Sequence, residues 1–190
     1  MDEAMRVGSA PVQAFVIVDA QRGFLEGEQA VVGASGLVDR LCELAVRARG
    51  AGALVVHLQN DGPVGALDEP GRPGWALHPR IVSGARETVI RKSDDDGFEG
   101  TGLGELLDSR GVRRVVIGGL LSEMCVSATA RTALVRGFDV VLPRDAHATY
   151  DLDDIPAAVV ARVAEHALGD EVEVVASVSE VAFGEAEAVV

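Results

Sequence analysis

The sequence predicts an α/β domain in which helices cover both faces of a mainly parallel, six-stranded sheet. Short apolar, β-branched runs alternate along the chain with segments whose apolar residues recur at helical spacing. That alternation requires crossover connections, which join parallel strands. The runs at residues 15–18 and 115–117 are apolar throughout, as is typical of strands that helices cover on both faces. The predicted class is therefore a three-layer α/β/α fold.

Six segments are predicted to be strands and four to be helices. The strands are residues 14–19, 53–58, 88–91, 114–118, 139–142 and 172–175. The helices are a segment around residues 37–48, then residues 103–110, 123–136 and 155–167. Ser35 is expected to cap the first helix, and Asp153 and Asp154 the last, because short polar side chains bind the free amides of a first turn.

Length and composition fit one globular domain. The 190 residues include 17 Lys and Arg against 30 Asp and Glu, a formal net charge of −13, and 48% are hydrophobic. Such an acidic chain argues against nucleic acid or an anionic membrane as a partner, because both require a basic surface. No apolar run approaches the ~18 residues of a membrane span. We expect residues 1–11 to be a flexible N-terminus and residues 12–190 to form the domain.

The two cysteines, Cys42 and Cys125, are expected to be free thiols. The first residues lack the basic start and the long apolar run of a secretory signal. We therefore expect a reduced, cytoplasmic protein, in which a disulfide is rare. Cys42 is expected on the apolar side of its helix, where a cysteine behaves as a small hydrophobic residue.

The longest irregular segment, residues 59–86, contains four of the seven prolines and the only tryptophan. A loop of this length in a compact domain commonly carries function. Phe24 and Trp75 are candidates for the wall of a substrate pocket. Ordinary packing of two large side chains is the alternative.

Three side chains with useful chemistry follow predicted strands. Asp19 ends the first strand, Lys92 follows the third, and Cys125 comes after the fourth, near the start of a helix. The carboxyl ends of parallel strands meet at the edge where α/β proteins bind ligands. An ammonium and a helix start both favour a thiolate, and a carboxylate can take a thiol proton and return it to a leaving amine. The set indicates acyl transfer by a cysteine.

Each of these residues also has a purely structural interpretation. Cys125 could be a small buried hydrophobic residue, and Asp19 a turn or cap residue. Lys92 could be a solvated charge ahead of the acidic run at residues 93–96. His147 could pair with Cys125 as a Cys/His dyad, although Asp19 already supplies a base. A non-catalytic binding protein on the same fold stays open, as does a thiol redox protein, which the lack of a Cys-x-x-Cys motif disfavours.

Three motifs in order make the sequence similar to a known family. They are Asp19-Ala20-Gln21-Arg22-Gly23-Phe24, then Arg91-Lys92 followed by Phe98-Glu99-Gly100-Thr101, then Gly118-Gly119-Leu120-Leu121-Ser122-Glu123-Met124-Cys125-Val126. Together they resemble the isochorismatase-like cysteine hydrolases, a superfamily that includes nicotinamidases, over residues 12–178. The resemblance implies a Rossmann-like fold and a catalytic triad of Asp19, Lys92 and Cys125. It also implies a cis peptide between Leu120 and Leu121, and an oxyanion hole made by the amides of Leu121 and Cys125.

The chain departs from metal-binding nicotinamidases after its second strand. Asn60 and Gly62 stand where those enzymes carry Asp and His, so we expect neither a metal nor another cofactor. Isochorismatases proper cleave a vinyl ether without a thiol, whereas a cysteine indicates an amide or lactam. Gln59 and the segments at residues 74–79 and 145–147 are most similar to uncharacterised cysteine hydrolases and to streptothricin hydrolases, which open a lactam. A family hydrolase for another small metabolite stays open.

The expected substrate pocket has five members, which are Gln21, Phe24, Gln59, Trp75 and His147. The resemblance also implies a homodimer or homotetramer, for which apolar helix surface is available. A cationic substrate is favoured if the acidic residues near the strand ends give the cleft a negative potential. These are Asp61, Asp68, Glu69, Asp94, Asp95 and Asp96. The alternative is that they are solvated charges that keep the protein in solution.

Overall fold

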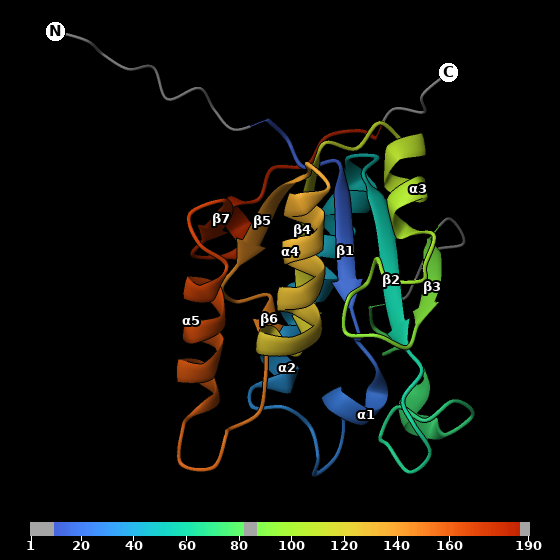
Figure 1. Cartoon of the computed structure of the whole chain (residues 1–190), viewed down its shortest axis with the longest axis vertical. Coiled ribbons are helices and arrows are strands. Elements are labelled where there is room, and N and C mark those ends of the chain that lie inside the picture. The colour runs from blue at the N-terminus through green and yellow to red at the C-terminus, as the bar shows by residue number, and fades with distance from the viewer. Residues whose placement is uncertain (1–9, 82–86, 187–190) are drawn as a thin grey trace, which may run out of the picture.

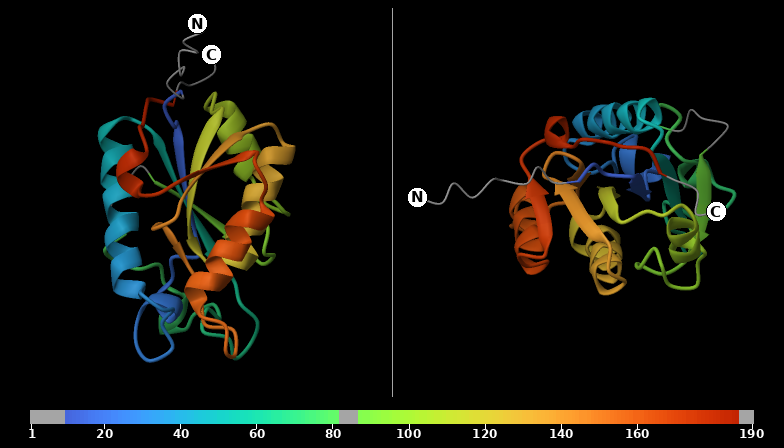
Figure 2. Two further views of the ribbon diagram at one scale, coloured as in Figure 1. Left: turned by 90° about the vertical axis from the view of Figure 1, so that its left-hand side faces the viewer. Right: turned by 90° about the horizontal axis from the view of Figure 1, so that it is seen from above.

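The computed structural model describes residues 10–81 and 87–186, which form three layers (Figure 1). Helix α2 (Ala34–Gly50) covers one face of a parallel sheet, and α3 (Leu103–Ser109), α4 (Ser127–Val135) and α5 (Ala157–Ala167) cover the other (Figure 2). The predicted three-layer α/β/α class is confirmed. Most of the expected N-terminal segment, residues 1–9, lies outside the described residues.

The sheet has the strand order β3-β2-β1-β4-β5-β7, and a short strand, β6, pairs with β4. All of the strand ladders are parallel. The six predicted strands are present, and β6 is additional. The bounds are Ala14–Val18 for β1, Leu54–Asn60 for β2, Thr88–Lys92 for β3, Arg114–Leu120 for β4, Asp139–Pro143 for β5, His147–Ala148 for β6 and Val172–Val175 for β7.

The predicted helix at residues 123–136 is two elements, a π-helical turn at Ser122–Val126 (η2) and then α4. Three further short helical elements are not among the predicted helices. They are α1 (Arg22–Leu25) and the 3-10 turns η1 (Pro73–Trp75) and η3 (Val178–Glu180). Within the described residues, no helix combines the length and apolar character needed to cross a bilayer.

The predicted start of α2 is wrong. Gly33 precedes the helix with a φ of 75°, a left-handed conformation that glycine adopts at little cost, and Ser35 lies inside the first turn. Cys42 is half-buried and packs against the core on the apolar side of α2, as expected, and its thiol donates a hydrogen bond to the Arg80 carbonyl oxygen at 3.2 Å. Cys42 is thus a free thiol with one backbone hydrogen bond.

The predicted start of α5 is also wrong, because the helix begins at Ala157 rather than two residues earlier. The Ala157 amide donates to the Asp151 carboxylate at 2.7 Å. Asp151 therefore satisfies a free amide of the first turn, which was expected of Asp153 and Asp154. Leu152 and Ile155 exchange backbone hydrogen bonds at 2.9 and 2.8 Å, and this turn separates Asp151 from the helix start along the chain.

Two apolar cores lie on opposite faces of the sheet, and β1 contributes to both. Phe15 and Ile17 pack on the α2 side, whereas Val16 and Val18 pack on the side of α3 and α4. All five residues of β1 are buried, as expected for a central strand covered on both faces. Because β1 lies between β2 and β4, the residue that follows it emerges at the middle of the sheet's carboxyl edge.

Candidate active site

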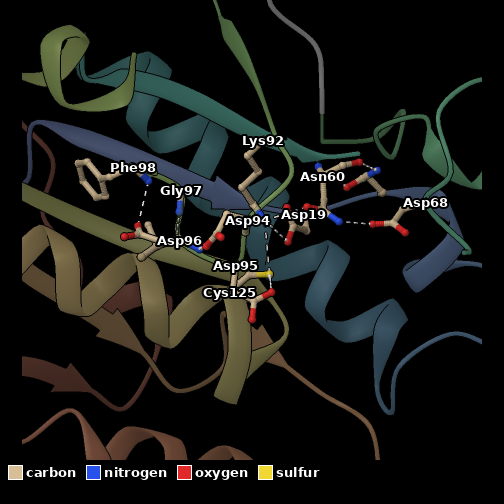
Figure 3. Close-up of polar contacts among 12 residues, drawn as sticks. Asp19, Asn60, Asp68, Lys92, Asp94, Asp95, Asp96, Gly97, Phe98 and Cys125 are labelled. Carbon is tan, nitrogen blue, oxygen red and sulfur yellow. Dashed lines mark hydrogen bonds and ion pairs between the residues drawn. The ribbon is translucent and has the colours of Figure 1, made fainter. Parts of the chain in front are cut away.

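The carboxyl ends of β1, β3 and β4 bring a carboxylate, an ammonium and a thiol into contact (Figure 3). Lys92 Nζ lies 3.0 Å from Asp19 Oδ2 and 3.4 Å from Cys125 Sγ. Asp19 follows β1, Lys92 is the last residue of β3, and Cys125 lies in η2, directly after β4. All three residues are buried. Residues that are far apart in the sequence thus form one buried polar cluster.

Asp19 adopts a left-handed backbone conformation, with a φ of 49°. That conformation costs a residue with a Cβ about 1–2 kcal/mol, so neighbouring groups must hold it. The Asp19 amide donates to the Leu58 carbonyl oxygen at 3.0 Å, and the Asp19 carbonyl oxygen accepts from the Gln21 amide at 2.6 Å. The chain turns sharply there, as is typical of functional sites that maintain local strain.

Burial raises the pKa of Asp19 from 3.8 to about 6, although the Lys92 ammonium opposes this rise. Burial disfavours the charge of Lys92 as well, but Asp19 and Cys125 outweigh it and raise the pKa of Lys92. The two side chains are therefore an ion pair at neutral pH. The second carboxylate oxygen, Asp19 Oδ1, is buried and has no hydrogen-bond partner among the described residues. It is an acceptor available for a proton.

The pKa of the Cys125 thiol is raised, first by burial and then by the negative charge of Asp19. Lys92 offsets only part of this effect. The ammonium thus favours the thiolate, as the sequence led us to expect, but burial and the charge of Asp19 outweigh it. The resting group is a thiol beside a carboxylate, and it becomes a nucleophile only if its proton moves to an acceptor.

Cys125 lies in the π-helical turn η2, in which Ser122 is also buried. The peptide bond between Leu120 and Leu121 is cis, in agreement with the family resemblance. The Leu121 carbonyl oxygen accepts hydrogen bonds from amides of the turn, at 3.2 Å from Met124 and Val126. The turn therefore holds the sulfur and the backbone around it together. The role of the Leu121 and Cys125 amides as an oxyanion hole stays a prediction.

Gln21 and Gln59, two expected pocket residues, use their side-chain amides to brace the backbone. Gln21 Nε2 donates to the carbonyl oxygens of Asn60 and Trp75, both at 2.9 Å, and Gln21 Oε1 accepts from the Asn60 amide at 2.8 Å. Gln59 Nε2 donates to the same Trp75 carbonyl oxygen at 2.9 Å. Both glutamines are buried. They hold the loop after β2 against the end of β1, and contact with a substrate stays a prediction.

The two expected aromatic pocket residues, Phe24 and Trp75, are half-buried. Trp75 Nε1 donates to Asp61 Oδ1 at 2.9 Å, and the Arg91 guanidinium lies 5.1 Å from the centre of the Trp75 ring. Phe24, in α1, packs against the core on the α2 side. Each ring is fixed by its neighbours and keeps part of its surface exposed, and its contact with a substrate stays a prediction.

His147, at the start of β6, contacts the nucleophile turn. His147 Nδ1 lies 2.8 Å from Ser122 Oγ, and Nε2 lies 3.6 Å from Glu165 Oε1. Among the described residues, the side chains that form hydrogen bonds with Cys125 Sγ are Lys92, at 3.4 Å, and Asp95, at 3.5 Å, and His147 is not one of them. These contacts favour a positioning role for His147 over the alternative Cys/His dyad.

Sequence reasoning missed the roles of Asn60, Asp68 and Asp95 (Figure 3). Lys92 Nζ donates to Asn60 Oδ1 at 3.3 Å, and Asn60 Nδ2 donates to Asp68 Oδ2 at 2.6 Å. The Cys125 thiol donates to Asp95 Oδ1 at 3.5 Å. Asn60 ends β2, so the rule that identified Asp19 also predicts its place at this edge. No sequence signal separates Asp68 and Asp95 from the other acids of their loops.

The described residues contain no group of three or more His, Cys, Asp or Glu side chains arranged to hold a metal ion. Asn60, one of the two residues whose identity led us to expect no metal, forms side-chain hydrogen bonds with Lys92 and Asp68. An ammonium therefore occupies the contact that a cation would make with Asn60. Independence from metals stays a prediction.

Comparison with known proteins agrees with the fold and identifies the family. The isochorismatase domain family matches residues 13–177. Two streptothricin hydrolases from Streptomyces noursei are 56% and 55% identical over 90% and 93% of this chain, which spans 65% and 73% of their lengths. The crystal structure of an isochorismatase from Pseudomonas putida KT2440 has a TM-score of 0.83 and 30% identity, covering 90% of this chain and 93% of that one. Because the family model matches most of this chain, the chain belongs to the isochorismatase family.

Proposed function

We propose that the protein is a cysteine-dependent hydrolase that cleaves the C–N bond of an amide or lactam through a thioester acyl-enzyme. The observation that carries this proposal is the contact of one buried ammonium, Lys92 Nζ, with both Asp19 and Cys125. The similarity to streptothricin hydrolases supports a C–N bond, and a lactam in particular, as the target.

In the proposed first step, Cys125 Sγ attacks the carbonyl carbon while its proton moves to Asp19. Asp19 Oδ1 is the available acceptor, because it is buried and has no hydrogen-bond partner among the described residues. With a pKa of about 6, Asp19 is largely ionised at neutral pH and is also a good proton donor once protonated. Lys92 stabilises the negative charge that passes from the carboxylate to the sulfur and onto the substrate.

In the proposed second step, the tetrahedral intermediate collapses and the C–N bond breaks. Protonated Asp19 donates its proton to the leaving nitrogen, and a thioester on Cys125 remains. Water then attacks the thioester carbonyl carbon and gives a proton to Asp19. The C–S bond breaks and Asp19 returns the proton to the sulfur. The amides of Leu121 and Cys125 are the proposed oxyanion donors in both steps.

We also propose that the protein acts in the cytoplasm on a small molecule as a homodimer or homotetramer, with no nucleic-acid or membrane partner. An apolar stripe on and before α5 supports self-association. Ile155, Val159 and Val163 are spaced by four residues and are 41%, 49% and 61% exposed. A symmetric contact between two copies would bury such a surface.

The test of this function is a turnover assay with a panel of linear amides and lactams, streptothricin included. Chromatography with mass detection follows the loss of each substrate and the appearance of the acid and the amine. We expect hydrolysis of at least one C–N substrate, and none with Cys125→Ala. An active enzyme that hydrolyses only esters or vinyl ethers, or a Cys125→Ala variant with unchanged turnover, would overturn the proposal.

A further inference from the structure

Cys125 has a second carboxylate neighbour, which the proposed mechanism does not use. The Cys125 thiol donates to Asp95 Oδ1 at 3.5 Å (Figure 3). Asp95 lies in the loop after β3, three residues beyond Lys92, and is exposed. The nucleophile therefore shares the Lys92 ammonium with one buried carboxylate, Asp19, and contacts one exposed carboxylate, Asp95.

The two acids on either side of Asp95 are engaged within the protein. Asp94 Oδ1 accepts from the Asp96 amide at 3.0 Å. Asp96 Oδ1 accepts from the Phe98 amide at 2.9 Å, and Asp96 Oδ2 accepts from the Thr132 hydroxyl at 2.6 Å. Asp94 and Asp96 therefore shape the loop and bind it to α4. The Asp94 and Asp96 carboxylates hold the loop through these hydrogen bonds, whereas the Asp95 carboxylate contacts the Cys125 thiol.

The three acids of the long loop are either paired with a cation or buried. Asp61 forms an ion pair with Arg91 at 2.6 Å, and Glu69 forms one with Arg72 at 2.7 Å. Asp68 is buried. Of the acids expected to give the cleft a negative potential, Asp61 and Glu69 are thus paired with cations, which weakens their field. Asp68 accepts a hydrogen bond from Asn60 Nδ2 at 2.6 Å, and its charge contributes to the raised pKa of Asp19.

Asp95 has no cationic partner among the described residues, whereas Lys92 is paired with Asp19. Two carboxylates, Asp19 and Asp95, thus lie around the Cys125 thiol, and within the part of the chain that the structure describes the Lys92 ammonium is the one cation in contact with it. An unpaired negative charge beside the sulfur opposes the thiolate and the oxyanion that follow from it. With a neutral substrate, Asp95 is therefore unfavourable for the reaction. Asp95 favours the reaction if the substrate carries a positive charge that lies next to the Asp95 carboxylate.

A second feature of the same cluster also indicates a ligand that donates hydrogen bonds. Asp19 Oδ1 is a buried carboxylate oxygen without a hydrogen-bond partner among the described residues, and its side chain is only 5% exposed. A buried acceptor of this kind is costly to leave unpaired. The two carboxylates, one deep and one at the surface, together favour a substrate that carries N–H groups and positive charge.

We propose that Asp95 is a specificity-determining residue that binds an ammonium or guanidinium group of the substrate next to the scissile carbonyl, because its Oδ1 lies 3.5 Å from Cys125 Sγ. The inference rests on the proposed function and names the substrate class of that site, which is a cationic amide or lactam. The substrate cation removes the repulsion between Asp95 and the developing oxyanion, and it positions the carbonyl over Cys125 Sγ. The pairing strengthens as the bound substrate displaces water from Asp95.

The first test measures the charge selectivity of Cys125 with two thiol reagents and needs no substrate. The cationic reagent is 2-(trimethylammonium)ethyl methanethiosulfonate, and the anionic reagent is 2-sulfonatoethyl methanethiosulfonate. Each modification rate is divided by that of 2-mercaptoethanol, which removes the intrinsic reactivity of the reagent. All variants carry Cys42→Ser, so that Cys125 is the only thiol.

We expect Asp95→Asn to lower the cationic-to-anionic rate ratio about tenfold, the size expected for one partly desolvated charge pair. The ratio is unaffected by a general change in thiol reactivity, because that change acts on both reagents. The matched control is Glu99→Gln, which removes an exposed acid of the same loop, and it should leave the ratio within about twofold. An Asp95→Asn ratio that changes no more than the control ratio would overturn the inference.

The second test uses two matched lactams, one with a trimethylammonium group beside the carbonyl and one with the neutral, isosteric tert-butyl group. Asp95→Asn should lower kcat/KM about tenfold for the cationic lactam and raise it for the neutral one. An equal fall for both lactams indicates a structural role and contradicts the inference. If the reagent ratio responds as expected but no amide or lactam is hydrolysed, the cation site stands and the proposed function fails.

Discussion

Lys92 Nζ and Asp19 Oδ2 form an ion pair of 3.0 Å in which neither side chain is more than 5% exposed. A buried pair of this kind gains little net stability, because removing both charges from water offsets most of their attraction. Its value in this fold is chemical. Lys92 keeps Asp19 ionised in a place where burial alone favours the neutral acid, and it contacts the sulfur at the same time.

Replacement of the nucleophile or of its base should abolish turnover. We expect Cys125→Ala and Asp19→Asn each to lower kcat by a factor of about 10³ or more, as loss of a nucleophile or its base does in other enzymes. Circular dichroism should show that both variants fold. His147→Ala is the comparison. A mild Asp19→Asn together with a more damaging His147→Ala would support the Cys/His dyad instead.

The pH dependence of kcat/KM should show an acid limb with an apparent pKa of about 6. Asp19 must be ionised to accept the thiol proton, and its pKa is raised from 3.8 to about 6 by burial, so activity falls as pH drops through that value. Lys92 lowers the pKa of Asp19, so Lys92→Gln should move the limb to higher pH. Arg91→Gln, which removes a neighbouring exposed cation, serves as the control. A limb near pH 4 in the unmodified protein would contradict this assignment.

Activity should survive exhaustive chelation. The reason is that the Asn60 side chain is already hydrogen-bonded to Lys92 and Asp68, and the described residues contain no cluster of three or more His, Cys, Asp or Glu side chains suited to a metal ion. Turnover is measured after dialysis against a chelator and again after addition of zinc, iron or manganese. Loss on chelation with recovery on addition of one metal is the contrary result.

The protein should be a dimer or a tetramer in solution. Light scattering at micromolar concentration should give two or four times the 19.8 kDa of one chain. Because Val159 and Val163 expose apolar surface on α5, Val159→Glu with Val163→Glu should shift the protein toward smaller species if that helix forms the contact. A mass near 20 kDa for the unmodified protein would show that it is a monomer.

The strands and their polar ends could be predicted from the sequence because their signals are local. The apolar runs of β1 and β4 indicate buried parallel strands, and parallel strands bring the residues after them to one edge. That rule is sufficient to place Asp19, Lys92 and Cys125 together. The same reasoning reaches Asn60, which ends β2.

The roles of the acidic residues could not be predicted, because they depend on contacts between distant segments. Asp96 differs from Asp95 through a hydrogen bond to Thr132 on α4, which no local pattern encodes. The raised pKa of the Cys125 thiol likewise depends on burial by surrounding elements. Short elements such as α1 and η2 are also set by packing around them and carry no periodicity of their own.

The central claim is that Cys125 forms a thioester with the substrate, and rapid-quench mass spectrometry of the intact protein tests it most directly. With a lactam, ring opening retains the amine, so a transient adduct should add the full mass of the substrate to the chain. Peptide mapping should place this adduct on Cys125, and Cys125→Ala should show none. Steady turnover with no adduct at any time, or an adduct on another residue, would contradict the account.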